Sequence, residues 1–150
     1  MSVLKEKLHS ACVAYVQQRI QAATEAIEQA QQAQTDDTKS SAGDKYETGR
    51  EMAQQETNRN MAQLAEANKL MIVLNRISVT GQSPVADTGS VVVTDNGNFY
   101  LSVSAGTIYL HGDIYYAVSI ASPVGVKIRG KKAGDVFDLN GKGYKIVSVE

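Results

Sequence analysis

The chain has 150 residues, with 15 basic and 16 acidic side chains and a formal net charge of −1. This length suits one ordinary domain or two small ones, and the charge gives no general attraction to nucleic acid, so any such contact has to be local. The single cysteine, Cys12, excludes an internal disulfide framework, and only His9 and His111 could offer imidazole to a metal. We therefore expect no metal or cofactor bound by the chain alone.

The start of the chain lacks a basic region followed by an apolar core and a small-residue cleavage site. No apolar run approaches the roughly 20 residues needed to span a bilayer. The sequence therefore predicts a cytoplasmic protein with no membrane partner.

A first helix is predicted from Lys5 to about Ala33, because this segment has no Gly or Pro and is rich in Ala, Gln and Glu. Apolar residues recur there every three or four positions, which is the spacing of a coiled-coil seam. The seam positions are Val13, Val16, Ile20, Ala23, Ile27 and Ala30.

A second helix is predicted from about Asp44 to Arg76, with a comparable heptad that becomes polar toward its N-terminal end. Its seam positions are Ala53, Thr57, Asn60, Leu64, Ala67, Met71 and Leu74. Between the helices, "QTDDTKSSAG" gathers residues that favour turns and caps. Residues 1–77 thus read as an antiparallel coiled-coil hairpin about 45 Å long, with an acidic tip near residues 35–47. A hairpin that packs sideways in a bundle or dimer is the alternative.

From residue 78 onward, short β-branched and aromatic runs alternate with turn residues, which predicts strands. The runs are Val91 to Thr94, Phe99 to Ser104, Thr107 to Leu110, Ile114 to Ile120, Asp135 to Leu139, and Tyr144 to Val149. Asn96-Gly97 favours a hairpin with a type I′ turn, and Pro123 to Arg129 favours a short helix that Gly130 stops. The predicted fold class is α+β, with a small, mostly antiparallel sheet and one short helix in residues 78–150.

Asp44 and Glu47 lie three residues apart after Gly43, at the start of the second predicted helix. Asp at an N-cap and Glu at the third helical position can each bond a backbone amide, so the spacing alone favours a capping box. A reactive pair at the end of the hairpin is the other interpretation.

The last third of the chain, Val118 to Glu150, carries an ordered set of short motifs. They are Ser122-Pro123, Gly130-Lys131-Lys132, Gly134-Asp135 and Tyr144-Lys145-Ile146. This order resembles the C-terminal domain of the Gre transcript cleavage factors of bacterial RNA polymerase, and the preceding hairpin agrees with that family's architecture. The resemblance implies that residues 78–150 form an FKBP-like domain.

The hairpin tip is also similar to the Gre pattern, in which Gly-Asp-x-x-Glu-Asn precedes an Ala-Glu-Tyr run. Gly43, Asp44 and Glu47 match, whereas Thr48 replaces the Asn and Gly49-Arg50-Glu51 replaces the run. The resemblance implies a factor that is not itself an enzyme. Its hairpin would enter the polymerase secondary channel, and Asp44 and Glu47 would share the polymerase Mg²⁺ and stimulate cleavage of backtracked RNA. Asp36 and Asp37 are possible auxiliary acids.

The departures at the tip favour one alternative, a Gre-like regulator that occupies the channel without cleaving. An FKBP-like prolyl isomerase is another, although fold alone does not carry activity and the chain has only Phe99 and Phe137 besides its tyrosines. A structural coiled-coil dimer is the last. We expect a monomer that contacts nascent RNA only indirectly.

Four basic residues, Lys127, Arg129, Lys131 and Lys132, form a local group that could contact polymerase or RNA phosphates, or could be a solvated face. Tyr109, Tyr115 and Tyr116 are expected to pack rather than to stack on bases. His111 lies in a predicted turn, and neither it nor Cys12 suggests a catalytic triad.

Overall fold

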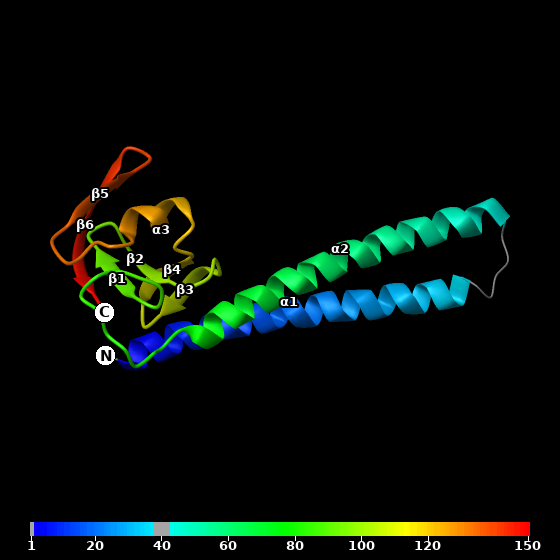
Figure 1. The fold of residues 1–150 in the computed structure, drawn as a ribbon, viewed down its shortest axis with the longest axis horizontal. Helices are drawn as coiled ribbons and strands as arrows, with labels where there is room; N and C mark the ends of the chain where they lie inside the picture. Colours follow the sequence, from blue (N-terminus) through cyan, green and yellow to red (C-terminus); the bar gives the residue numbers. More distant parts are fainter. Residues whose placement is uncertain (1, 38–42) are drawn as a thin grey trace. The chain divides into compact units, whose positions relative to one another are not determined.

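The structure is a computed structural model that describes the backbone of residues 2–37 and 43–150 and the side chains of residues 3–32 and 49–150. It contains two long helices, then a six-stranded sheet with one short helix (Figure 1). The α+β class predicted from the sequence is confirmed. No helix in the described part of the chain is long and apolar enough to cross a membrane.

The chain divides into two compact units. The hairpin unit is Val16–Met71, and the sheet unit combines Met1–Tyr15 with Ile72–Glu150. The first turns of the first helix therefore belong with the sheet.

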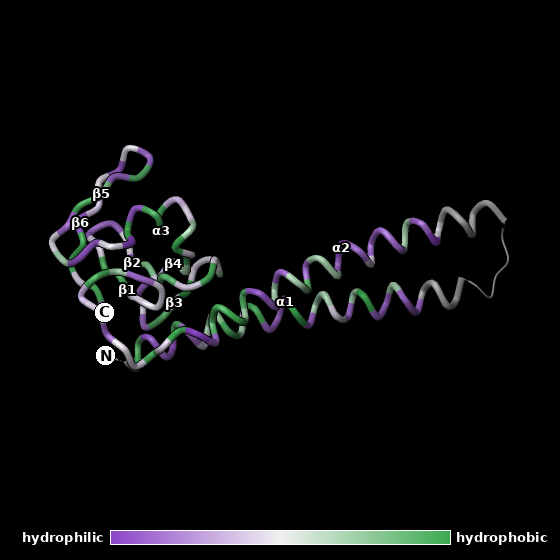
Figure 2. Tube along the Cα trace, viewed as in Figure 1, coloured by the Kyte–Doolittle hydropathy of each residue, from purple (hydrophilic) through white to green (hydrophobic). Residues whose placement is uncertain are grey.

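Helices α1 (Ser2–Asp37) and α2 (Gly43–Arg76) run side by side (Figure 1). Every seam position predicted from the heptads is buried or half-buried, whereas most of the remaining positions of α2 are exposed. Figure 2 shows hydrophilic residues through the middle of α2 and a mainly hydrophobic stretch near its C-terminal end. The periodicity thus identified the inner face of both helices and its change in polarity.

Two polar side chains occupy the α2 seam. Thr57 and Asn60 are buried, and neither Thr57 Oγ1 nor Asn60 Nδ2 has a hydrogen-bond partner among the described residues. An unpaired buried polar group costs about 1–3 kcal/mol. The seam is therefore weakened where it turns polar.

The six strands form one sheet in the order β3-β4-β2-β1-β6-β5. Only β2 and β4 pair in parallel, and the other neighbours are antiparallel. The strands are β1 (Val91–Thr94), β2 (Gly97–Leu101), β3 (Gly106–Leu110), β4 (Asp113–Val118), β5 (Val136–Leu139) and β6 (Lys142–Val149). All six lie where the sequence predicted strands.

The turn between β1 and β2 differs from the predicted type I′ turn in the residues that form it. Thr94 pairs with Gly97, so Asp95-Asn96 is the loop between β1 and β2, but neither of these residues has the positive φ of a type I′ turn. The type I′ prediction at Asn96-Gly97 is wrong, because Gly97 pairs with Thr94 in the ladder instead of forming part of the loop. Both loop residues have positive φ in His111-Gly112 and in Asn140-Gly141.

The sheet is covered on both faces. Phe99 and Leu101 of β2 lie on one face in a core with Val124 and Ile128 of the short helix α3 (Pro123–Ile128). Tyr100 points to the other face, where its hydroxyl lies 3.4 Å from Nδ1 of His9 on α1.

The three tyrosines predicted to pack differ in their exposure. Tyr115 is buried on β4, whereas Tyr116 and Tyr109 are 40% and 76% exposed. β3 is an edge strand, so Tyr109 has a neighbouring strand on one side only. Tyr115 thus packs in the core and Tyr116 packs against Phe99, whereas the packing prediction is wrong for Tyr109.

Candidate functional site

The predicted tip acids lie at the ends of the two long helices. The backbone of α1 reaches Asp37 and that of α2 starts at Gly43, so Asp44 and Glu47 fall in the first turns of α2. The side chains of Asp36, Asp37, Asp44 and Glu47 lie outside the described residues. Both the capping role and the metal role therefore stay predictions.

A metal site built by this chain alone finds no support in the described residues. No three or more His, Cys, Asp or Glu side chains among them are arranged to hold a metal ion.

The residues of the Ser-Pro motif organise the start of α3. Ser122 Oγ accepts a bond from the amide of Gly125 at 3.0 Å and donates to the carbonyl of Ser119 at 2.6 Å, while Pro123 occupies the first turn. This is N-capping with Pro in the position where its missing amide costs nothing.

The same turn also requires a glycine at position 125, and the sequence analysis did not identify this requirement. A Cβ at this position would lie 2.0 Å from the carbonyl oxygen of Ser119, which is backbone and cannot rotate away. A Gly two residues after a Ser-Pro cap is the signal that could have drawn attention to it.

The Gly-Asp motif joins the loop after α3 to the last strand. Asp135 Oδ2 accepts from the amide of Lys132 at 2.9 Å. The amide of Gly134 donates to the carbonyl of Ile146, and the amide of Ile146 donates to the carbonyl of Asp135, each at 2.8 Å. These bonds align the loop with β6, where Ile146 is buried in the core.

The basic group occupies the end of α3 and the segment after it. Lys127, Arg129 and Lys132 are exposed and Lys131 is half-buried. Residues of this segment bond Ala86, whose amide donates to the carbonyl of Lys131 at 2.7 Å and whose carbonyl accepts from Gly130 at 2.8 Å. The structure thus gathers the four basic residues in one short stretch of the sheet unit.

Arg129 also has an acidic partner in that unit. Its Nε lies 3.6 Å from Oδ1 of Asp87, and both side chains are more than half exposed. A surface ion pair of this kind contributes about 0–1 kcal/mol, so Arg129 can exchange Asp87 for another anion at little cost.

Several polar groups are buried between the start of α1 and the sheet. Burial raises the pKa of the Cys12 thiol to about 11 and raises the pKa of Tyr100 strongly. Burial lowers the pKa of His9. A thiol with such a pKa stays protonated near neutral pH and is a poor nucleophile. The expectation that Cys12 forms no catalytic triad agrees with this environment.

The aromatic rings pack against one another. Phe137 stacks on Tyr144 with centroids 4.8 Å apart, and Phe99 contacts Tyr116 at 5.8 Å. The cavities along residues 73–90 are lined by polar and aliphatic residues.

Comparisons with known proteins find a likeness among solved structures. A scan against protein-family models finds no match, and a search among curated proteins finds none either. Among solved structures, one described as the structure of the transcription factor Gfh1 is 20% identical and aligns over 89% of this chain and 90% of that chain, with a TM-score of 0.34. A superposition at that TM-score does not define a common fold, so it carries no functional argument.

Proposed function

We propose that this chain is a Gre-type transcription factor that binds bacterial RNA polymerase through its secondary channel. We further propose that the chain stimulates cleavage of backtracked RNA. The observation that carries it is the motif series in Val118–Glu150 in a chain that begins with two long helices. Two of the motifs have distinct local tasks, since Ser122 caps α3, Pro123 begins it and Asp135 aligns the loop with β6.

The dimensions of the hairpin support insertion into a channel. Helix α2 has 34 residues, which corresponds to a length of about 50 Å. Small seam residues such as Ala23 and Ala67 let two helices approach closely and keep the pair thin. Most outward positions in the middle of α2 are polar, as a surface that slides into a solvated passage requires, although Met52, Met61 and Ile72 are exposed.

At the tip, the carboxylates of Asp44 and Glu47 would add oxygen ligands to the magnesium site of the polymerase and orient the attacking water. Mg²⁺ takes oxygen ligands and commonly combines one or two carboxylates with substrate phosphates. In this proposal the polymerase supplies the catalytic centre and this chain is not an enzyme by itself. The basic group at residues 127–132 would bind an acidic polymerase surface or RNA phosphates.

RNA cleavage in stalled polymerase complexes tests the assignment. We expect the wild type to accelerate cleavage and the Asp44→Asn, Glu47→Gln double variant to lose at least about tenfold of that acceleration, as expected for the loss of metal ligands. Glu56→Gln with Glu66→Gln is the matched control, because it removes the same charge from exposed positions of α2 away from the tip. Equal stimulation by wild type and the Asp44, Glu47 variant would remove these acids from the mechanism.

The tip departures at Thr48 and Gly49-Arg50-Glu51 favour a second candidate, a channel regulator without cleavage activity. Binding to purified polymerase, measured in competition with a known secondary-channel ligand, separates the possibilities. Competition without stimulated cleavage selects the regulator. Absence of any binding contradicts both candidates.

A further inference from the structure

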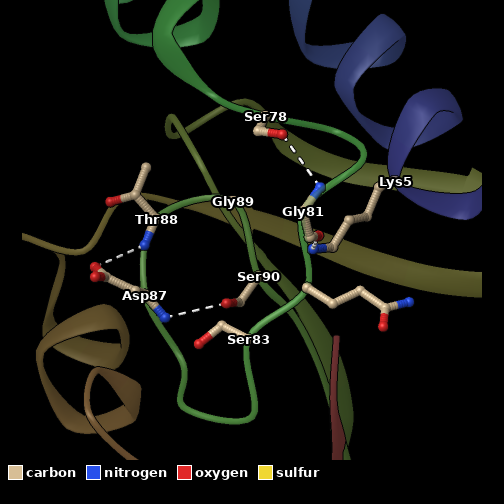
Figure 3. A pocket seen from close by; sticks show the side chains of 9 residues that line it. Lys5, Ser78, Gly81, Ser83, Asp87, Thr88, Gly89 and Ser90 are labelled. Carbon is tan, nitrogen blue, oxygen red and sulfur yellow. Dashed lines mark hydrogen bonds between the residues drawn. The ribbon is translucent and has the colours of Figure 1, made fainter. Parts of the chain in front are cut away.

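The sheet unit contains a polar cavity that the proposed function does not use. It has a volume of about 270 Å³ and lies between the first turns of α1 and the loop of residues 78–90 (Figure 3). Its lining includes Lys5, Ser78, Gly81, Asp87, Thr88 and Ser90. We call it the Lys5 cavity. Its volume lies just below the range of about 300–1,000 Å³ that is usual for ligand pockets, which suits a small ligand.

Lys5 is the most unusual residue of this lining. It is only 4% exposed, yet its ammonium group donates to a single described acceptor, the carbonyl of Gly81 at 2.7 Å. An ammonium group has three donors, so two remain for other partners. Burial lowers the pKa of Lys5, while the negative charge of Glu150 raises it. A buried ammonium without a carboxylate in contact favours the approach of an anion.

Ser90 places a second donor on the same cavity. It is 3% exposed, and its Oγ accepts from the amide of Asp87 at 3.1 Å. That bond uses a lone pair and leaves the hydroxyl proton free to donate. In Figure 3 the Ser90 side chain points toward Asp87, and the Lys5 ammonium group lies beside Gly81. Both residues line the cavity, so a ligand inside it would meet two side-chain donors.

The backbone of the loop passes close to the segment that follows α2. Gly89 has a φ of +95°, and a Cβ there would lie 3.2 Å from a methyl carbon of Ile77. Its amide donates to the carbonyl of Leu101 at 2.6 Å, which ties this side of the cavity to β2. The lining is thus organised before any ligand binds.

Negative charge near the cavity is only partly neutralised. Asp87 is at the rim, where its Oδ1 accepts from the amide of Thr88 at 2.8 Å and faces Arg129 at 3.6 Å. Glu150 acts on Lys5 through space, and its Oε2 is buried without a partner among the described residues. Arg129 offsets Asp87, so Glu150 is the charge that most opposes an anion beside Lys5.

We propose that the Lys5 cavity binds a small oxyanion of the phosphate class, with Lys5 and Ser90 donating to its oxygens. A tetrahedral phosphoryl group accepts from several directions, as this pair of donors requires, and charge-assisted hydrogen bonds to it are the strong ones. Free phosphate and a small phosphate ester share this chemistry. The cavity is independent of the hairpin tip and of any cleavage activity.

Amide chemical shifts of the full chain, followed by two-dimensional NMR, test the proposal. Inorganic phosphate, added against chloride at constant ionic strength, should cause saturable shifts centred on Gly81, Gly89 and Ser90. Adenosine 5′-monophosphate is the second probe, with adenosine as its control. Tighter binding of the monophosphate would identify an ester as the ligand, and tighter binding of phosphate would identify the free ion. Shifts that do not saturate, or that spread over surface lysines, would overturn the proposal.

Variants distinguish a ligand site from a structural lysine. Lys5→Met should weaken phosphate binding about tenfold or more, Ser90→Ala should weaken it severalfold, and Lys7→Met should leave it unchanged. Lys7 is the matched control because it is an exposed lysine on the same helix that donates to His111 Nε2. Glu150→Gln should tighten binding, and this variant keeps the test decisive if Lys5→Met does not fold. Unchanged affinity in both Lys5→Met and Glu150→Gln, or in Glu150→Gln alone where Lys5→Met does not fold, would refute the site.

Discussion

The two units of this chain bury different kinds of side chain. In the hairpin unit the buried positions are mostly small or polar, such as Ala23, Thr57 and Ala67. In the sheet unit they include Tyr100, Leu101 and Ile128, each fully buried. Stabilisation by burial grows with the apolar area removed from water, so the sheet unit is expected to be the more stable of the two. The comparison teaches that small seam residues keep the two helices of the hairpin close together but bury little apolar area, whereas the large side chains of the sheet unit bury much more.

Leu101→Ala is the strongest test of this contrast. Leu101 is fully buried among Val92, Phe99 and Ile128, so its truncation should lower the free energy of unfolding of the sheet unit by about 2–5 kcal/mol. Leu64→Ala, in the half-buried hairpin seam, should cost about 1 kcal/mol because less apolar area is lost. Native-state hydrogen exchange measures each unit by its own amides. Equal losses would show that the seam packs as tightly as the sheet core.

Gly125→Ala tests the close contact at the start of α3. The new methyl group would meet the carbonyl oxygen of Ser119, so we expect a loss of about 1–3 kcal/mol in chemical denaturation. Gly143→Ala is the matched control, because its Cβ would meet only a side-chain oxygen of Asp138 at 3.6 Å. A Gly125 variant as stable as the Gly143 variant would mean that α3 can move away from β4 at little cost.

Thr57→Val sharpens the comparison from the hairpin side. It replaces an unpaired buried hydroxyl with a methyl group of similar shape and should stabilise the hairpin unit by about 1 kcal/mol. Thr24→Val is the control of opposite sign, since Thr24 Oγ1 donates to the carbonyl of Ile20 at 2.8 Å. Hydrogen exchange of hairpin amides reports both changes. Destabilisation by Thr57→Val would reveal a partner for its hydroxyl.

The smallest expected effect concerns pH and the contact between α1 and the sheet. Burial lowers the pKa of His9 in the folded state, whereas in the unfolded state this pKa keeps its ordinary value of about 6.5. As the pH falls through about 6.5, the unfolded state therefore binds more protons than the folded state. Stability of the sheet unit should therefore decrease below that pH, by less than about 1 kcal/mol per pH unit. Urea midpoints measured between pH 7.5 and 5 check this. His9→Gln should remove that part of the slope while His111→Gln, an exposed control, should not.

Much of the fold could be predicted because its signals are local. The heptads placed both seams, and β-branched runs between turn residues placed all six strands. The type I′ turn was misplaced because Asn-Gly marks a turn without specifying which two residues form the loop. That choice depends on the register of β1 against β2, in which Thr94 faces Gly97.

The candidate site was only partly predictable. The basic residues at 127–132 were identified as a group, yet the pairing of Arg129 with Asp87 joins residues 42 positions apart. The buried polar residues of α1 were missed because the apolar stripe was followed only from Val13 onward. Leu8 and Cys12 extend it toward the N-terminus, and both are fully buried.

The sequence by itself determined the two helices, their inner faces and the strand order along the chain, because periodicity and turn residues act over a few positions. Only the tertiary structure decided that the first turns of α1 belong with the sheet, that β2 and β4 pair in parallel, and that Lys5 is buried beside a polar cavity. These features depend on contacts between segments distant in the chain. From sequence alone, a lysine in a helical pattern is predicted to be exposed to solvent, because the element that covers it is not known.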